Sequence, residues 1–128
     1  MKKIFLDANI LIDLIDSNRT KHNEVLEFIK KNSNSYFYTS CDILTTIYYV
    51  TKKVKEPLLE IEKLLDLVYV ISFSNAETKE AIDLMNVDKR FKDLEDTLQY
   101  ILAKQIKADC IVTNDKGFCS PDIEIINI

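Results

Sequence analysis

Short runs of consecutive apolar residues recur along the chain and predict buried β-strands. Three clear runs are Ile4-Phe5-Leu6, Val68-Tyr69-Val70-Ile71 and Cys110-Ile111-Val112. A β-prone segment, Tyr36-Phe37-Tyr38, and the segment Ile123–Ile126 give two more candidates. Unbroken apolar runs are typical of strands that are covered on both faces, as in a parallel sheet.

Between the predicted strands, apolar residues recur at the spacing of a helix. Six segments show this pattern: residues 10–15, about 20–31, a third that begins near residue 40, Pro57 through Leu65, Ala76 to about Met85, and Leu94 to Ile106. The third helix is capped by Thr39 or Ser40 and has Ile43, Ile47, Val50 and Val54 on one face. In the third helix, we expect Tyr48 in the core and Tyr49 on the surface. Strands that alternate with helices predict an α/β fold with a parallel sheet and right-handed crossovers. No repeat or linker divides the chain, so we expect one domain over residues 1–128.

The composition narrows the functional classes. A net charge of −4 and a pI of about 5.0 argue against a protein that coats nucleic acid electrostatically. An enzyme that acts on RNA is still compatible with this charge, because a metal in an acidic cleft supplies local positive charge. The three scattered cysteines are interpreted as reduced thiols of a cytosolic protein. The first residues reach a charge too soon for a signal peptide, and no apolar run approaches the ~20 residues of a membrane span. We therefore expect a cytoplasmic protein without membrane contact.

Acidic residues follow the ends of three predicted strands and open the last predicted helix. Asp7, Asp42 and Asp115 follow strands, and Glu95 and Asp96 lie in the first turn of the helix. In a parallel α/β sheet, helix N-termini lie at the carboxyl edge of the strands, where such folds bind ligands. We therefore expect these five carboxylates, together with Asp93 at the start of the same helix, to project toward the same edge.

Several carboxylates at one place repel each other unless a cation joins them. Oxygen-only ligands suit Mg²⁺ or Mn²⁺. His22 is the only histidine and lies on a predicted apolar helix face, which disfavours a histidine-rich zinc site. Carboxylate-held metal ions bind phosphate oxygens and activate water, so the pattern indicates cleavage of phosphodiesters without a residue nucleophile.

Simpler structural roles compete with this interpretation. Asp7 follows a strand and opens a helix, as an N-cap does, and Asp93 fits the capping position of the last helix. Glu95 and Asp96 are also favoured there by the helix dipole, and Asp115 fits a plain turn. Because adjacent helical residues differ by about 100°, Glu95 falls at the edge of the apolar stripe and Asp96 nearly opposite it. These two acids are not expected to have the same role.

Three segments resemble the motifs of PIN domains. They are Leu6-Asp7-Ala8-Asn9-Ile10-Leu11-Ile12-Asp13-Leu14, Asp93-Leu94-Glu95-Asp96-Thr97-Leu98 and Ala108-Asp109-Cys110-Ile111-Val112-Thr113-Asn114-Asp115-Lys116-Gly117-Phe118. The order, spacing and flanking strands agree with that family over nearly the whole chain.

The resemblance implies an α/β/α sandwich with a parallel sheet of about four to five strands. It also implies Mg²⁺- or Mn²⁺-dependent ribonuclease activity of the VapC toxin kind on an RNA substrate, inhibited by a cognate antitoxin. We further expect a homodimer. By motif match, the implied metal ligands are Asp7, Asp96 and Asp115, and the implied supporting or substrate-side groups are Asn9, Thr113 and Asn114.

One position departs from the family. A glutamate is common in the helix after the second strand, where this chain has Thr46. Asp42, four residues earlier, compensates for it in one hypothesis, and Glu95 in another. The departure keeps open a weakened PIN domain that binds RNA or protein without cutting. A phosphotransfer domain of receiver or phosphatase type is a third possibility, disfavoured because Asn9 stands where such sites usually have a second acid.

Overall fold

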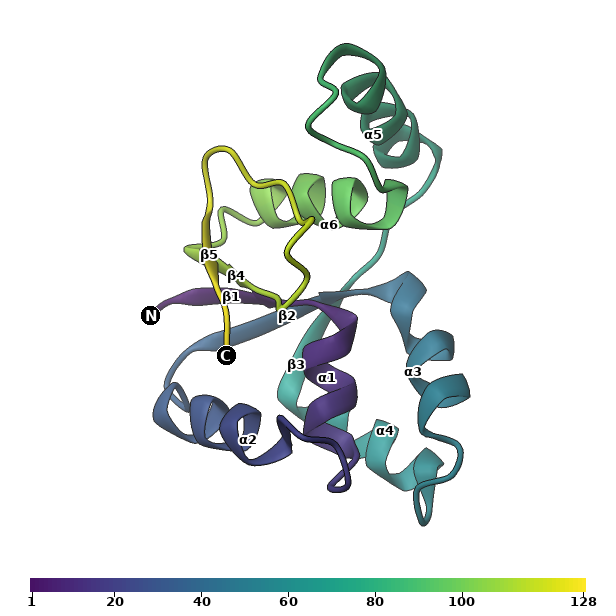
Figure 1. The fold of residues 1–128 in the computed structure, drawn as a ribbon, viewed down its shortest axis with the longest axis vertical. Coiled ribbons are helices and arrows are strands. Elements are labelled where there is room, and N and C mark those ends of the chain that lie inside the picture. The colour runs from purple at the N-terminus through teal and green to yellow at the C-terminus, as the bar shows by residue number, and fades with distance from the viewer.

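All five strands form one parallel sheet in the computed structural model, which describes residues 1–128. The strands are β1 (Lys3–Leu6), β2 (Tyr36–Ser40), β3 (Val68–Ile71), β4 (Cys110–Val112) and β5 (Glu124–Ile126), in the spatial order β3-β2-β1-β4-β5 (Figure 1). The predicted α/β class with a parallel sheet is confirmed. β1 lies at the centre, between β2 and β4.

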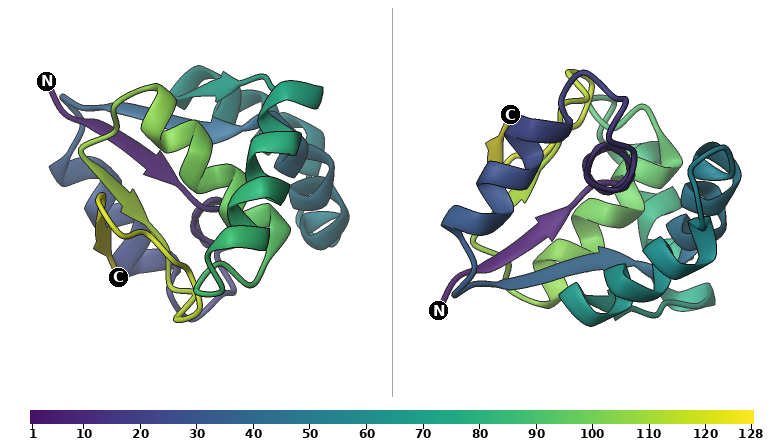
Figure 2. Two further views of the ribbon diagram at one scale, coloured as in Figure 1. Left: turned by 90° about the horizontal axis from the view of Figure 1, so that it is seen from above. Right: turned by 90° about the horizontal axis from the view of Figure 1, so that it is seen from below.

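Six α-helices cover the two faces of the sheet. They are α1 (Ala8–Ile15), α2 (His22–Lys31), α3 (Leu44–Thr51, preceded by a 3₁₀ turn at Cys41–Ile43), α4 (Pro57–Leu67), α5 (Asn75–Val87) and α6 (Leu94–Gln105). The first four helices lie on one face, and α5 and α6 lie on the other (Figures 1 and 2). This arrangement is the α/β/α sandwich that the motif resemblance implied.

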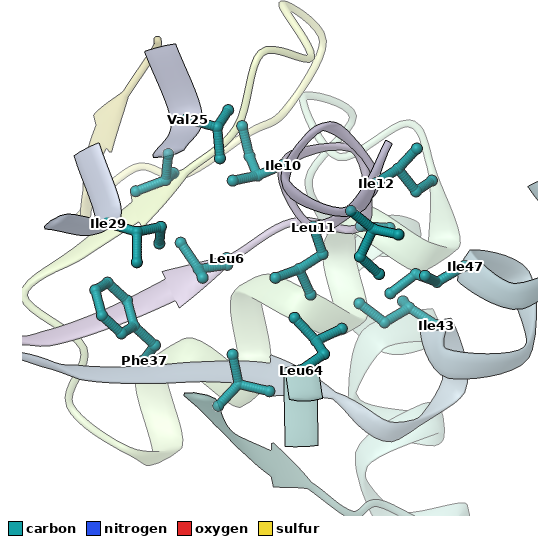
Figure 3. Packing of buried hydrophobic residues seen from close by; sticks show 14 of the residues in the cluster. Leu6, Ile10, Leu11, Ile12, Val25, Ile29, Phe37, Ile43, Ile47 and Leu64 are labelled. Carbon is teal, nitrogen blue, oxygen red and sulfur yellow. The ribbon is translucent and has the colours of Figure 1, made fainter. Parts of the chain in front are cut away.

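Alternation along the strands divides the core into two parts. In β1, Ile4 and Leu6 pack among α1 to α4, whereas Phe5 points to the α5–α6 side. All three side chains are at most 1% exposed, so the strand is buried on both faces, as its unbroken apolar run predicted. Figure 3 shows the larger part of the core, where Leu11 of α1 lies between the sheet and Ile47 of α3.

The predicted apolar face of the third helix was partly wrong. The α-helix ends at Thr51, so Val54 lies beyond it, and Val50 is 47% exposed. Tyr48 is 40% exposed rather than in the core. Only Ile47 and Thr51 of α3 are fully buried, because the short helix meets the rest of the molecule along a narrow line.

The prediction for α6 was also incomplete. A single apolar stripe was expected, yet every residue from Thr97 to Ala103 is buried, while Leu94 at the start of the helix is 44% exposed. Its partners explain this burial, because α6 lies between the sheet and α5 (Figure 1). Even polar side chains of α6 are consequently enclosed, among them Gln99.

Candidate functional site

Asp7 occupies the centre of the candidate site. The backbone N–H of Asp7 donates to the carbonyl of Val112 (3.1 Å), so the β1–β4 pairing places it next to the residues that follow β4. Its side chain is buried, and Oδ1 accepts from the N–H of Ala8 at 2.7 Å. Oδ2 accepts from the hydroxyl of Thr113, also at 2.7 Å. The expected capping role is therefore present, but the other carboxylate oxygen is held by the residue that follows β4.

The surroundings of Asp7 set its charge state. Burial raises the pKa of Asp7, while hydrogen bonds from Thr113, Ala8 and Gln99 oppose the rise, and the charge of Asp115 adds to it. A carboxylate kept in a buried position by three donors is oriented and ready to neutralise a cation.

The segment after β4 brings Asp115 to the same place. Thr113 Oγ1, which donates to Asp7, also accepts from the backbone N–H of Asp115 (3.0 Å). Asp115 Oδ1 accepts from the N–H of Gly117 (2.8 Å), so the turn interpretation is correct as well. A Cβ at Gly117 would approach that oxygen to 3.3 Å, so glycine leaves room for the carboxylate. Asn114 Oδ1 accepts from the N–H of Ile128 (2.8 Å), which fastens this segment to the end of the chain.

Asp96 faces Asp115 from the N-terminus of α6. Asp93 caps this helix, as predicted, by accepting from the N–H of Asp96 at 2.9 Å. Burial raises the pKa of Asp96 to about 8, and the hydrogen bond and charge of Asp115, with the charges of Asp93 and Asp7, add to the rise. A raised pKa of this size favours the protonated form of Asp96 near neutral pH in the absence of a cation. Such a raised pKa is frequent at functional sites.

Glu95 lies near enough to Asp42 and Asp7 for their charges to act on it. Burial, followed by the charges of Asp42, Asp7 and Asp93, raises the pKa of Glu95. The two neighbours Glu95 and Asp96 thus both approach Asp7, but they meet different partners, Asp42 for one and Asp115 for the other. The expectation that they have different roles agrees with this placement.

Asp42 lies in a different element from the one that the compensation hypothesis assumed. It lies in the 3₁₀ turn before α3 rather than one turn before Thr46 in a continuous α-helix. Its carboxylate accepts from the hydroxyl of Ser40 at 2.5 Å, and both Asp42 and Thr46 are exposed. Its proximity to the site is seen in its effect on Glu95.

Gln99 was not identified from the sequence. It is 1% exposed, and its Nε2 donates to Glu95 Oε1 at 3.3 Å while also supporting Asp7. Its Oε1 has no hydrogen-bond partner and is the only such buried side-chain atom in the structure. Its position one helical turn after Glu95 and Asp96 was the available signal, but an isolated glutamine in a helix usually faces solvent.

The donor chemistry of the cluster fits a hard divalent cation. Asp7, Asp96 and Asp115 offer oxygen atoms only, as Mg²⁺ and Mn²⁺ prefer. However, no group of three or more such side chains already has the spacing of a metal shell. The hydrogen bond between Asp96 and Asp115 and the bond from Gly117 turn these carboxylates toward protein partners. The backbone therefore brings the three acids to one edge of the sheet, while their side chains are held by protein donors.

Comparison with known proteins places the chain in a family. The sequence model of the PIN domain matches residues 4–124. The chain belongs to the PIN-domain family. It is 43% identical to Ribonuclease VapC1 of Aquifex aeolicus (strain VF5), in an alignment that covers 98% of this chain and 90% of that protein. The PIN resemblance inferred from the three acidic motifs is thereby confirmed.

Solved structures share the fold of this PIN domain. VapC20 of Mycobacterium tuberculosis, described as a sarcin-ricin loop cleaving toxin, superposes with a TM-score of 0.72 at 12% identity, covering 89% of this chain and 92% of that one. A toxin-antitoxin complex from Klebsiella pneumoniae gives a TM-score of 0.70 at 18% identity, covering 96% and 95%. At such identities the likeness concerns the fold alone. In this PIN domain, no helix has the length and apolar character needed to span a membrane.

Proposed function

We propose that this PIN domain is a divalent-metal-dependent endoribonuclease and the toxin of a toxin-antitoxin pair. The observation that carries the proposal is the convergence of Asp7, Asp96 and Asp115, whose charges act on one another at one edge of the sheet. The identity of 43% to a protein named a ribonuclease supports the same activity.

The proposed reaction is hydrolysis of an RNA phosphodiester by water. Asp7, Asp96 and Asp115 are the proposed ligands of Mg²⁺ or Mn²⁺, which supplies an activated water and stabilises charge on the phosphate when bound. Thr113 orients Asp7 through its hydroxyl, and Gln99 orients Glu95. Glu95 and Asp42 stand where they can accept a proton from water or bind it. Asn9 and Asn114 lie on the rim beside Asp115 and are proposed to contact substrate.

A direct test is cleavage of single-stranded RNA with and without millimolar Mn²⁺. We expect cleavage that needs the metal and is lost in Asp96→Asn. Asp66→Asn, which changes an exposed acid on α4, is the matched control and should cleave like the wild type. Metal-independent cleavage, or equal activity of Asp96→Asn and Asp66→Asn, would count against the proposal.

A protein partner is the second part of the proposal. The fold is shared with the toxin of a known toxin-antitoxin complex, and the acidic cluster is complementary to a basic side chain of an inhibitor. We expect a homodimer that binds a small antitoxin. Expression of the chain alone should arrest growth, and co-expression with the adjacent reading frame should relieve the arrest. Light scattering tests the dimer.

The replacement at Thr46 favours one alternative function. A PIN domain with reduced metal affinity is able to bind RNA or protein without cutting. Binding of RNA by the wild type without cleavage at any Mn²⁺ concentration would support this alternative.

A further inference from the structure

A wholly polar groove extends from the acidic cluster along α1. It has a volume of about 650 Å³, and none of its nine lining residues is hydrophobic. It starts at Asp115 and Asn9 and ends at the connection between α1 and α2, where Arg19 and Lys21 lie. In the right-hand view of Figure 2, this connection passes beside the segment that follows β4.

Positive charge predominates in the groove, unlike in the rest of the chain. Arg19, Lys21 and Lys116 line it together with two acids, Asp13 and Asp115. Asp13 is buried and already paired, because Arg19 Nε donates to its Oδ1 at 2.6 Å. Away from Asp115, the groove therefore has an excess of cations in a protein whose net charge is −4.

Arg19 is held in place with its outer nitrogens free. Only Nε binds Asp13, and the two terminal nitrogens donate to no group of the protein. The loop around it is fixed by the bond from Arg19 N to Asp16 O (3.1 Å) and by the contact of His22 Nδ1 with Asp13 O (2.8 Å). A guanidinium positioned in this way is suited to bind a phosphate with two parallel hydrogen bonds.

The two lysines of the groove are also free to bind a ligand. Lys21 and Lys116 are exposed and take part in none of the ion pairs of the structure. Amide side chains also line the groove; of these, Asn9 makes no side-chain hydrogen bond and Asn114 uses only its oxygen. The groove thus presents hydrogen-bond donors that no group of the protein uses, and it adjoins carboxylates that are candidates for metal binding.

We propose that this groove binds the phosphates of a single RNA strand on one side of the bond to be cleaved, with Arg19, Lys21 and Lys116 as the phosphate contacts. The inference rests on the proposed nuclease function and adds the path of the substrate. A protein segment is a poorer fit, because peptide docking needs apolar pockets and this groove has none.

The test uses the full chain with Mn²⁺ and a non-cleavable, 2′-deoxy-substituted single strand of about ten nucleotides, within the usual length for such sites. Fluorescence anisotropy at several salt concentrations measures binding. Arg19→Ala should weaken binding about 10-fold, and Lys21→Ala and Lys116→Ala about 3-fold or more each. Each should also reduce the slope of log affinity against log salt by about 0.7, the value for one lost single-strand phosphate contact. Arg19→Lys should recover only part of the loss, because it restores charge without the two-pronged donor.

The matched control is Lys79→Ala on α5, on the opposite face of the sheet. It should change neither affinity nor salt slope, and the affinity of every variant for Mn²⁺, measured by calorimetry, should equal that of the wild type. Groove variants that bind RNA like Lys79→Ala would overturn the proposal. Groove variants that lose binding of a polyglutamate peptide but keep their affinity for RNA would also overturn the proposal. If RNA binds through the three cations but is never cleaved, the groove assignment stands and the nuclease proposal fails.

Discussion

Asp96→Asn should make the metal-free protein more stable at alkaline pH and leave it unchanged at acid pH. The pKa of Asp96 is raised from 3.8 to about 8 in the folded protein. A carboxyl group whose pKa is raised by folding binds its proton more tightly in the folded state than in the unfolded state. Its ionisation therefore removes stability as the pH rises from about 4 to about 8, and the loss is complete above that range. Asparagine cannot ionise, so the variant lacks this loss.

The size of the effect follows from the shift. Roughly four pKa units at about 1.4 kcal/mol each give an upper bound near 6 kcal/mol. The side chain of Asp96 is only partly buried and Asp115 is exposed, so solvent screening reduces this bound. We expect a gain of about 1–3 kcal/mol at pH 8.5, which corresponds to about 4–12 °C in Tm for a domain of this size. At pH 2.5 to 3, below the ordinary pKa of 3.8, both states hold the proton and the expected difference is close to zero.

The assay is unfolding in EDTA from pH 2.5 to 8.5, plotted as the difference between variant and wild type, so that the range starts below the ordinary pKa of 3.8. Groups common to both proteins cancel in this difference, and Asp66→Asn controls for loss of one negative charge. Addition of Mn²⁺ at one hundred times its dissociation constant should stabilise the wild type by about 2.7 kcal/mol and the variant much less. A Tm difference that does not vary with pH, or an equal gain from Mn²⁺ in both proteins, would refute the reasoning.

Four further substitutions test other parts of the structure. Leu11→Ala should lower the free energy of unfolding by about 2–5 kcal/mol in urea titrations, because the side chain is fully buried between the sheet and α3. Gln99→Met should leave the metal-free Tm unchanged or raise it, since it removes an unpartnered buried oxygen, yet weaken Mn²⁺ binding about 10- to 100-fold in calorimetry by releasing Glu95. Thr46→Glu should tighten Mn²⁺ binding and Asp42→Ala should weaken it, again measured by calorimetry; equal affinity in Asp42→Ala and wild type would leave Glu95 as the compensating acid.

β1 and β4 were predictable because burial on both faces leaves unbroken apolar runs in the sequence, and β3 keeps such a run although Tyr69 is 57% exposed. β3 and β4 have the predicted bounds, and β1 begins one residue earlier. Helix faces were less predictable. Spacing alone placed Val50 in the core, but the narrow contact of α3 leaves it exposed. For α6, the pattern of apolar residues does not show that α5 covers the side of the helix away from the sheet, so the burial of Gln99 was not predicted.

The site was predictable to the level of backbone placement. Residues directly after parallel strands meet at one edge, which located Asp7 and Asp115. The side-chain interactions depend on rotamers and burial, which no linear pattern encodes. The raised pKa of Asp96 beside Asp115 is one example, and the hydrogen bond from Gln99 to Glu95 is another.

The cluster is gathered by topology and is electrostatically unfavourable without a cation. The order β2-β1-β4 puts three strand ends side by side, so Asp7 and Asp115 approach each other whatever their side chains prefer. The protein relieves the resulting repulsion by protonating Asp96 and by turning oxygens toward backbone donors. Both adjustments are reversible at small cost, since a bound cation displaces the proton and attracts the same oxygens. Under the proposed function, a cation competes with protons for these oxygens, so metal binding should weaken at low pH. A cation, or the basic side chain of a partner, in the space between the acids would offset their repulsion.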